Sequence, residues 1–196
     1  MTNAERSIIE IVILLGAGLR VSEMYGLIKS DIDFESRKIR IERQLTRDKH
    51  CEYYIEPPKT KSGTRFIPMS NMVYQALMDT LESREPQRVE HMIDGCAGFL
   101  FLDKDGKPKV ALHLEHALKR MVDKYNATHD ILFPPITPHV LRHTFCTEMA
   151  NAGMDVKTLQ YLMGHSDVNT TLNIYTHSSY ETAADAFGKV KISQGG

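Results

Sequence analysis

Residues 137–145 read TPHVLRHTF, and this stretch combines a marked helix start with the densest group of polar side chains in the chain. Thr137 is a typical helix N-cap, and Pro138 suits the first helical position. A helix that begins there places His139 in its first turn, with Arg142 on the same side at the i+3 spacing. An arginine, a histidine and the free N–H groups of a helix start together favour a bound phosphate. The alternative is an ordinary helix with solvated polar residues.

Two short motifs downstream each carry one residue with acid–base or nucleophilic chemistry. Gly164 in MGHSD (163–167) predicts the end of a helix, and His165 follows it directly. Histidine is suited to proton transfer, or to a hydrogen bond with a phosphoryl oxygen, near neutral pH. Tyr175 in NIYTH (173–177) is one of eight tyrosines, so taken singly it is interpreted as a packing residue.

The N-terminal part predicts two helices in succession. Residues 4–16 (AERSIIEIVILLG) are apolar on almost every side, which indicates a buried helix. After Gly16 and Gly18, a short second helix carries Arg20 and Glu23, whose spacing places them on one face. A partly buried Arg20 needs an acceptor, and the sequence leaves open whether this is Glu23 or a bound phosphate.

The segment that follows is β-like. Residues 37–43 alternate charged and apolar side chains, and residues 53–56 and 64–68 look like a further pair of strands joined by the turn PPKTKSG. We therefore expect a three-stranded antiparallel sheet, with Lys59 and Lys61 at the hairpin tip. The predicted fold class is mainly α with this small sheet (α+β). Further helices are expected over residues 70–84, 111–126, 138–152, 155–163, 167–176 and 180–188.

The composition is that of a globular domain, but its charge is unevenly distributed. The chain has 196 residues, of which 42% are hydrophobic and 25% charged, and its net charge is −1. Residues 37–65 hold nine Lys or Arg against four Asp or Glu, a balance of +5. Residues 66–105 hold three against seven, a balance of −4. A basic face opposite an acidic one suits a phosphate backbone, although a randomly charged surface is an equally good interpretation.

Neither a membrane span nor a cofactor is expected. The longest apolar stretch, residues 11–19, is well short of the ~18–20 residues that a span needs. The three cysteines are widely spaced without a CxxC, and no signal peptide precedes them, which predicts a reducing, cytoplasmic location. The histidines lack the spacing of a zinc site, and phosphate-loop and dinucleotide motifs are absent, so we expect no metal.

Taken in order, five motifs resemble the catalytic domain of the tyrosine recombinases, the phage-integrase family, and look most like the integrases of conjugative transposons. These motifs are GLRVSE (18–23), PPKTKSG (57–63), TPHVLRHTF (137–145), MGHSD (163–167) and NIYTH (173–177). The resemblance implies that residues 1–177 form a catalytic DNA breaking and rejoining domain. Residues 178–196 are then expected to form a C-terminal helix or tail that docks in cis or on a neighbouring protomer. The family's N-terminal core-binding and arm-binding domains are expected to be absent from this chain.

The resemblance also implies a role for each matched residue. Arg20 and Arg142 would clamp the non-bridging oxygens of the scissile phosphate, and Glu23 would support Arg20. Tyr175 would be the nucleophile that forms a covalent 3′-phosphotyrosine.

Three further matches concern proton transfer. Lys59 would protonate the leaving 5′ oxygen, although Lys61 lies close enough in the same turn to leave this choice open. His139 and His165 would act in proton transfer and in hydrogen bonds to the phosphate.

The implied function is that of a site-specific recombinase that integrates or excises a mobile element without a metal or ATP. Its partners would be double-stranded DNA and further copies of the chain, assembled as a tetramer on the DNA. The alternatives are a type IB topoisomerase-like relaxing enzyme and a catalytically silent DNA-binding domain. The residues expected to contact DNA are Arg37, Lys38, Arg40, Arg43, Arg47, Lys61 and Arg65.

Overall fold

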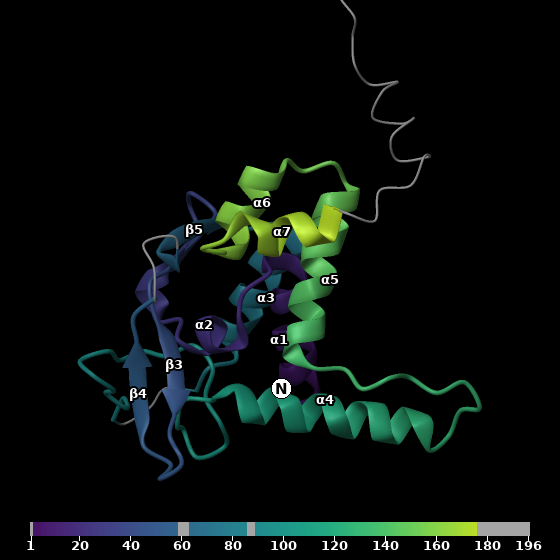
Figure 1. The fold of residues 1–196 in the computed structure, drawn as a ribbon. Coiled ribbons are helices and arrows are strands. Elements are labelled where there is room, and N and C mark those ends of the chain that lie inside the picture. The colour runs from purple at the N-terminus through teal and green to yellow at the C-terminus, as the bar shows by residue number, and fades with distance from the viewer. Residues whose placement is uncertain (1, 59–62, 86–88, 176–196) are drawn as a thin grey trace, which may run out of the picture.

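Helix α1 (Asn3–Ala17) runs through the centre of the fold and packs against α3 (Asn71–Glu82), α4 (Ala111–Asn126) and α5 (Pro138–Asn151) (Figure 1). The computed structural model describes residues 2–58, 63–85 and 89–175. Helix α1 starts with a reciprocal capping box in which Thr2 and Glu5 satisfy each other's backbone N–H groups. It ends at Gly18, whose φ of 63° is the left-handed conformation that glycine adopts at low cost.

Helix α1 is less uniformly buried than its sequence predicts. Ile13 and Leu14 are fully buried in the main core, but Ile8 is 54% exposed. Glu10 is buried, and its carboxylate accepts hydrogen bonds from the Tyr25 hydroxyl and from the Lys109 ammonium group. The prediction of a buried helix therefore holds for one face only.

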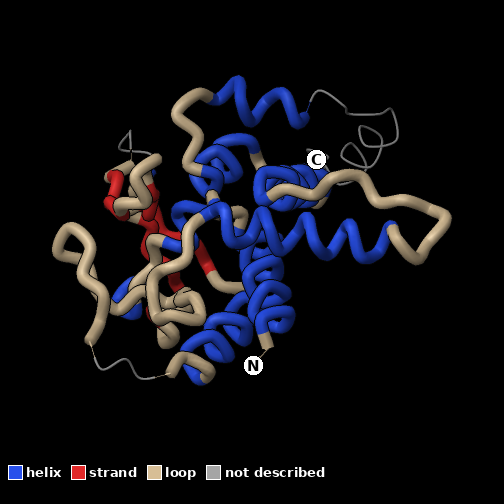
Figure 2. Tube along the Cα trace, turned by 90° about the horizontal axis from the view of Figure 1, so that it is seen from below, coloured by secondary structure: helices blue, strands red, loops and turns tan. Residues whose placement is uncertain are grey.

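The strands form two small antiparallel sheets. The three-stranded sheet has the order β1 (Ile32–Asp33), β2 (Lys38–Ile41), β5 (Arg65–Pro68). The two-stranded sheet pairs β3 (Gln44–Arg47) with β4 (Tyr53–Glu56). In Figure 2 the strands gather on one side of the molecule and most of the helices lie toward the other.

The predicted pairing of the strands is wrong. Residues 53–56 were expected to form a hairpin with residues 64–68, but β4 pairs with β3, and β5 pairs with β2. The reason lies in the segment 48–52, where the Asp48 carboxylate accepts the backbone N–H groups of His50 and Glu52. This tight turn closes a hairpin earlier in the chain. The buried side chains of Ile39 and Ile67 pair β2 with β5 across the longer connection.

Short helices complete the fold. Helix α2 (Val21–Tyr25) and the 3-10 helix η1 (Lys29–Asp31) lead into the sheets, and α6 (Val156–Met163) and α7 (Val168–Tyr175) lie together beside one end of α5 (Figure 1). The mainly α fold class with a small antiparallel sheet is confirmed, and predicted helix ends from α3 onward differ from the observed ones by two residues or fewer. The expected helix over 180–188 and the tail 178–196 lie outside the described residues. Within the described ranges, no helix is both long and apolar enough to cross a membrane.

Candidate active site

The buried carboxylate of Glu23 organises the site. Arg20 lies just before α2, and its Nη1 donates to Glu23 Oε1 at 2.8 Å while its backbone N–H donates to Oε2 at 2.9 Å. Arg65 of β5 approaches from the other side, with Nη1 3.0 Å from Oε1 and Nη2 2.9 Å from Oε2. The question left open by the sequence is thereby answered in part, because Arg20 has Glu23 as its acceptor. Its side chain nevertheless stays 37% exposed.

A third guanidinium group lies at the same carboxylate, since Arg142 Nη1 is 3.8 Å from Glu23 Oε2. Burial alone would raise the pKa of Glu23, but the hydrogen bond and charge of Arg65, with the charges of Arg20 and Arg142, lower it. Glu23 is therefore ionised at neutral pH. Three guanidinium groups against one carboxylate leave a balance of 3 − 1 = +2 at this point, which favours binding of an anion.

Arg142 is held by backbone carbonyls from two other segments. Its Nη1 donates to Gly18 O at 2.6 Å, and its Nη2 donates to Met163 O. Gly18 is required there: its φ is 63°, and a Cβ would lie 2.2 Å from Cδ1 of Phe145. Burial and the neighbouring charge of Arg20 lower the pKa of Arg142 to about 10, so the guanidinium stays charged at neutral pH.

His165 is fixed by its own loop and by α7. Its backbone N–H donates to Gln160 O, and the Gln160 side-chain amide donates back to His165 O, both at 3.2 Å. Its ring Nδ1 lies 3.0 Å from the hydroxyl oxygen of Thr171. Burial and the charges of Arg142 and Arg20 lower the pKa of His165 to about 4, so the ring is neutral at pH 7.

One cavity of about 380 Å³ brings four of the predicted residues together. It lies between the start of α2, the start of α5 and the loop between α6 and α7, and its volume is sufficient for a phosphodiester group. The four predicted residues that line it are Arg20, His139, Arg142 and His165. The helix start at Thr137 and Pro138, predicted from the sequence, presents His139 at the exposed rim of this cavity.

Tyr175, the predicted nucleophile, does not line the cavity. It is the last residue of α7, and its hydroxyl donates a hydrogen bond to the backbone carbonyl of Met154 in the turn before α6. Burial raises the pKa of Tyr175 above its usual value. In this arrangement the phenol is protonated and turned to a backbone acceptor.

The residues expected to contact DNA fall into two groups. Arg37, Lys38, Arg40 and Arg47 are exposed or half-buried on or beside the sheets, and Arg40 also pairs with Asp31 and Glu42. Arg43 and Arg65 differ from the expectation because they are buried: Arg43 pairs with Asp31, and Arg65 with Glu23. Guanidinium groups occupied in this way are structural, so these positions are poor candidates for DNA contact. Lys59 and Lys61 lie outside the described residues.

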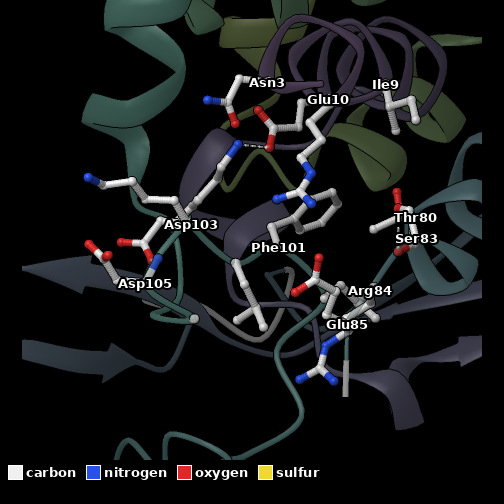
Figure 3. Close-up of a pocket in the computed structure, with 16 residues that line it drawn as sticks. Asn3, Ile9, Glu10, Thr80, Ser83, Arg84, Glu85, Phe101, Asp103 and Asp105 are labelled. Carbon is white, nitrogen blue, oxygen red and sulfur yellow. Dashed lines mark hydrogen bonds and ion pairs between the residues drawn. The ribbon is translucent and has the colours of Figure 1, made fainter. Parts of the chain in front are cut away.

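A second cavity, of about 500 Å³, lies on another part of the molecule between α1, α3 and the segment 100–109 (Figure 3). Glu10 and Lys109 form an ion pair there, and Asp103 and Asp105 lie at its margin. It contains none of the predicted catalytic residues. Among the residues that the structure describes, no group of three or more His, Cys, Asp or Glu side chains is placed to hold a metal ion.

Two residues of the site were not predicted from the sequence: Arg65 in its structural role, and Thr171. Arg65 was grouped with the other basic residues of 37–65, although it lies in the alternating stretch 64–68, where every second side chain is buried. Thr171 lies four residues before Tyr175, so a helical arrangement of 167–176 already places both on one face. Its contact with His165 depends on how the loop after α6 turns.

The sequence pattern along the chain identifies the class of protein to which this fold belongs. The sequence pattern of the phage integrase family matches residues 2–182, and the chain belongs to this family.

Three known proteins show where in the family the similarity lies. The chain is 51% identical over 175 residues to the transposase from transposon Tn916 of Enterococcus faecalis, covering 89% of this chain and 43% of that protein. It is 32% identical over 163 residues to the tyrosine recombinase XerC of Chlamydia trachomatis, covering 83% and 44% respectively. The solved Tn1549 transposon integrase in complex with transposon right end DNA has 44% identity and a TM-score of 0.87, covering 97% of this chain and 60% of that one. The chain thus spans less than half the length of these two curated relatives.

Proposed function

We propose that this chain is the catalytic part of a site-specific recombinase of the conjugative-transposon integrase type, which cleaves and rejoins DNA through a covalent 3′-phosphotyrosine. The observation that carries this proposal is the cavity in which Arg20, Arg142, His139 and His165 converge from three separate segments. The names of the relatives, a transposase and an integrase solved with transposon DNA, support the same assignment.

The chemistry follows from the charges around the cavity. A phosphodiester that enters it meets the guanidinium groups of Arg20 and Arg142, which offset the charge that builds up on a pentavalent phosphorus. The Tyr175 oxygen forms a bond to phosphorus while the bond from phosphorus to the 5′ oxygen breaks. The tyrosine proton passes to a base, for which His139 at the rim is the candidate, and Lys59 is proposed to protonate the leaving oxygen.

The resealing step needs no further energy source. The phosphotyrosine bond keeps the energy of the broken phosphodiester, so the free 5′ hydroxyl of the same or a partner strand attacks it and releases Tyr175. Before the first step, the Tyr175 hydroxyl must leave the carbonyl of Met154 and enter the cavity. We infer that this movement of α7 accompanies binding of DNA.

Double-stranded DNA is the proposed substrate, bound in part by the accessible basic residues Arg37, Lys38, Arg40 and Arg47. We further propose that several copies of the chain assemble on DNA, as strand exchange between two duplexes requires. Integration or excision of a mobile element is the outcome that the similarity to transposon enzymes supports.

Covalent trapping tests the proposal. The protein is incubated in EDTA with nicked duplexes from both ends of the genetic element that carries its gene, and the products are separated on a denaturing gel. The nick lets the short cleaved fragment diffuse away, so the covalent complex accumulates. We expect a slowly migrating band for the wild type and none for Tyr175→Phe. Binding of these duplexes without a band would leave a DNA-binding module, and relaxation of unrelated supercoiled plasmid would favour a topoisomerase.

A further inference from the structure

The hydroxyl of Thr171 is the buried polar group of α7 that the chemistry above does not use. Thr171 has no exposed surface, and its Oγ1 lies 3.0 Å from Nδ1 of His165. Within the described part of the chain, this nitrogen is the only hydrogen-bond partner of the Thr171 hydroxyl. Two other helical threonines, Thr80 and Thr144, donate instead to the carbonyl four residues earlier.

The direction of this hydrogen bond follows from burial. If Nδ1 carried the proton and donated to Thr171, the threonine O–H would be a buried donor without an acceptor among the described residues, which is unfavourable. If Thr171 donates to Nδ1, both groups are satisfied. A neutral imidazole that accepts at Nδ1 carries its proton on Nε2. The ring is then a hydrogen-bond donor toward the cavity that His165 lines.

We propose that Thr171 is a positioning residue that fixes the Nε2–H tautomer of His165, so that this histidine donates a hydrogen bond to the anion bound between Arg20 and Arg142. The part that concerns the anion rests on the proposed function, whereas the tautomer itself does not. Thr171 does not line the cavity and acts through the ring of His165.

The same hydrogen bond connects the histidine to the nucleophile. Thr171 and Tyr175 lie four residues apart on α7 and therefore on the same face of this helix. The loop of His165 is in turn held to α6 by the reciprocal hydrogen bonds with Gln160. This side-chain contact thus links the ring of His165 to the helix that carries Tyr175.

The tautomer is tested on the full chain by NMR of the histidine ring nitrogens, with His165→Gln used to assign the signals of His165. The wild type is expected to show a protonated Nε2 and an unprotonated Nδ1 at pH 7. Thr171→Ser keeps the hydroxyl and should keep this tautomer, whereas Thr171→Val keeps the shape and should give a mixture of both. A protonated Nδ1 in the wild type, or an unchanged tautomer in Thr171→Val, overturns the proposal.

The consequence for cleavage is tested by a double-mutant cycle on the rate of covalent complex formation. Outer hydrogen-bond partners of histidines in metal sites are worth about 10- to 100-fold in activity, and we expect Thr171→Val to slow cleavage by at least about 10-fold. Thr171→Ser should retain most of the rate, and Thr171→Val should add little to His165→Gln.

Equal losses from Thr171→Val in both backgrounds would assign Thr171 to packing of α7 alone and overturn the proposal. A wild type with the expected tautomer but no covalent complex would overturn the proposed function and leave the tautomer assignment in place.

Discussion

Arg65 and Glu23 form a buried bidentate ion pair, with Nη1 and Nη2 of the arginine 3.0 and 2.9 Å from the two carboxylate oxygens. This pair joins β5 to α2, although the two residues are 42 positions apart in the chain. Arg65 also donates to Leu162 O at 2.7 Å and to Gly63 O at 3.1 Å. The end of α6 and Gly63, the last residue of the PPKTKSG turn, are therefore linked through Arg65 to the carboxylate that orients Arg20.

Replacement of Arg65 should mainly destabilise the fold. Arg65→Ala leaves the Glu23 carboxylate buried without the charge and hydrogen bonds of Arg65. Removal of one partner of a buried ion pair costs about 3–5 kcal/mol. The free energy of unfolding, measured by urea denaturation, should fall by that amount. The matched control is Lys38→Ala, which removes an exposed cation from β2 and should change the stability by no more than about 0.5 kcal/mol. Equal effects of the two substitutions would contradict the structural role of Arg65.

Replacement of Lys38 should weaken DNA binding while leaving the stability of the fold nearly unchanged. Each lysine that neutralises a phosphate releases a counterion, so its loss lowers the slope of log affinity against log salt concentration by about 1. Lys38→Ala is expected to weaken binding of a duplex and to reduce this slope, as measured by fluorescence anisotropy over a range of salt concentrations. An unchanged slope would remove Lys38 from the DNA-contacting surface.

Two glycines in similar conformations provide a sharp comparison. Gly164 has a φ of 60°, and a Cβ there would lie 2.7 Å from Nη1 of Arg65, whereas Gly153 has a φ of 83° and nothing within 4 Å. Gly153→Ala should cost about 1 kcal/mol through its backbone conformation alone. Gly164→Ala should cost clearly more, about 2–4 kcal/mol, because it also displaces the guanidinium of Arg65. Thermal unfolding of both variants checks this order. A reversed order would contradict the prediction, because it would show that the loop at Gly164 moves to accept a Cβ without displacing Arg65.

The depressed pKa of His165 predicts an acid-sensitive contribution to stability. The unfolded chain takes up a proton at this ring near pH 6.5, but the folded chain does so only near pH 4. The unfolded state therefore binds more protons between these values, so stability is lost as the pH falls from about 6.5 towards 4. Because the ring is only half-buried, we expect a loss of about 1 kcal/mol at pH 5.

The control for this prediction is His165→Gln, which cannot titrate. The difference in unfolding free energy between the wild type and this variant should shift by that amount between pH 7 and pH 5. A difference that is independent of pH would mean that His165 titrates normally in the folded protein.

Much of the fold is readable from local sequence signals. Thr137 with Pro138 marks the start of α5, and Gly164 marks the end of α6, because caps are decided by a few neighbouring residues. The pairing of the strands was not predictable in the same way. It depends on whether residues 48–52 or the PPKTKSG turn closes a hairpin, and both contain turn-forming residues.

The same distinction between local signals and long-range packing applies to the site. The cavity residues Arg20, His139, Arg142 and His165 were found from their motifs, because each motif is a short continuous stretch of the sequence. The burial of Arg65 and Arg43 was missed because charge counting along the chain does not show which strand face is covered. The contact of Thr171 with His165 was missed because it bridges a loop and a helix.

The most direct test of the central claim is identification of the residue that becomes joined to DNA. The covalent complex, formed in EDTA on a nicked duplex, is digested with nuclease and protease, and the peptides are analysed by mass spectrometry. We predict a nucleotide adduct linked through a 3′ phosphate to Tyr175. The Tyr175→Phe variant should give no such adduct. An adduct on another residue, or DNA cleavage without any adduct, would contradict the account.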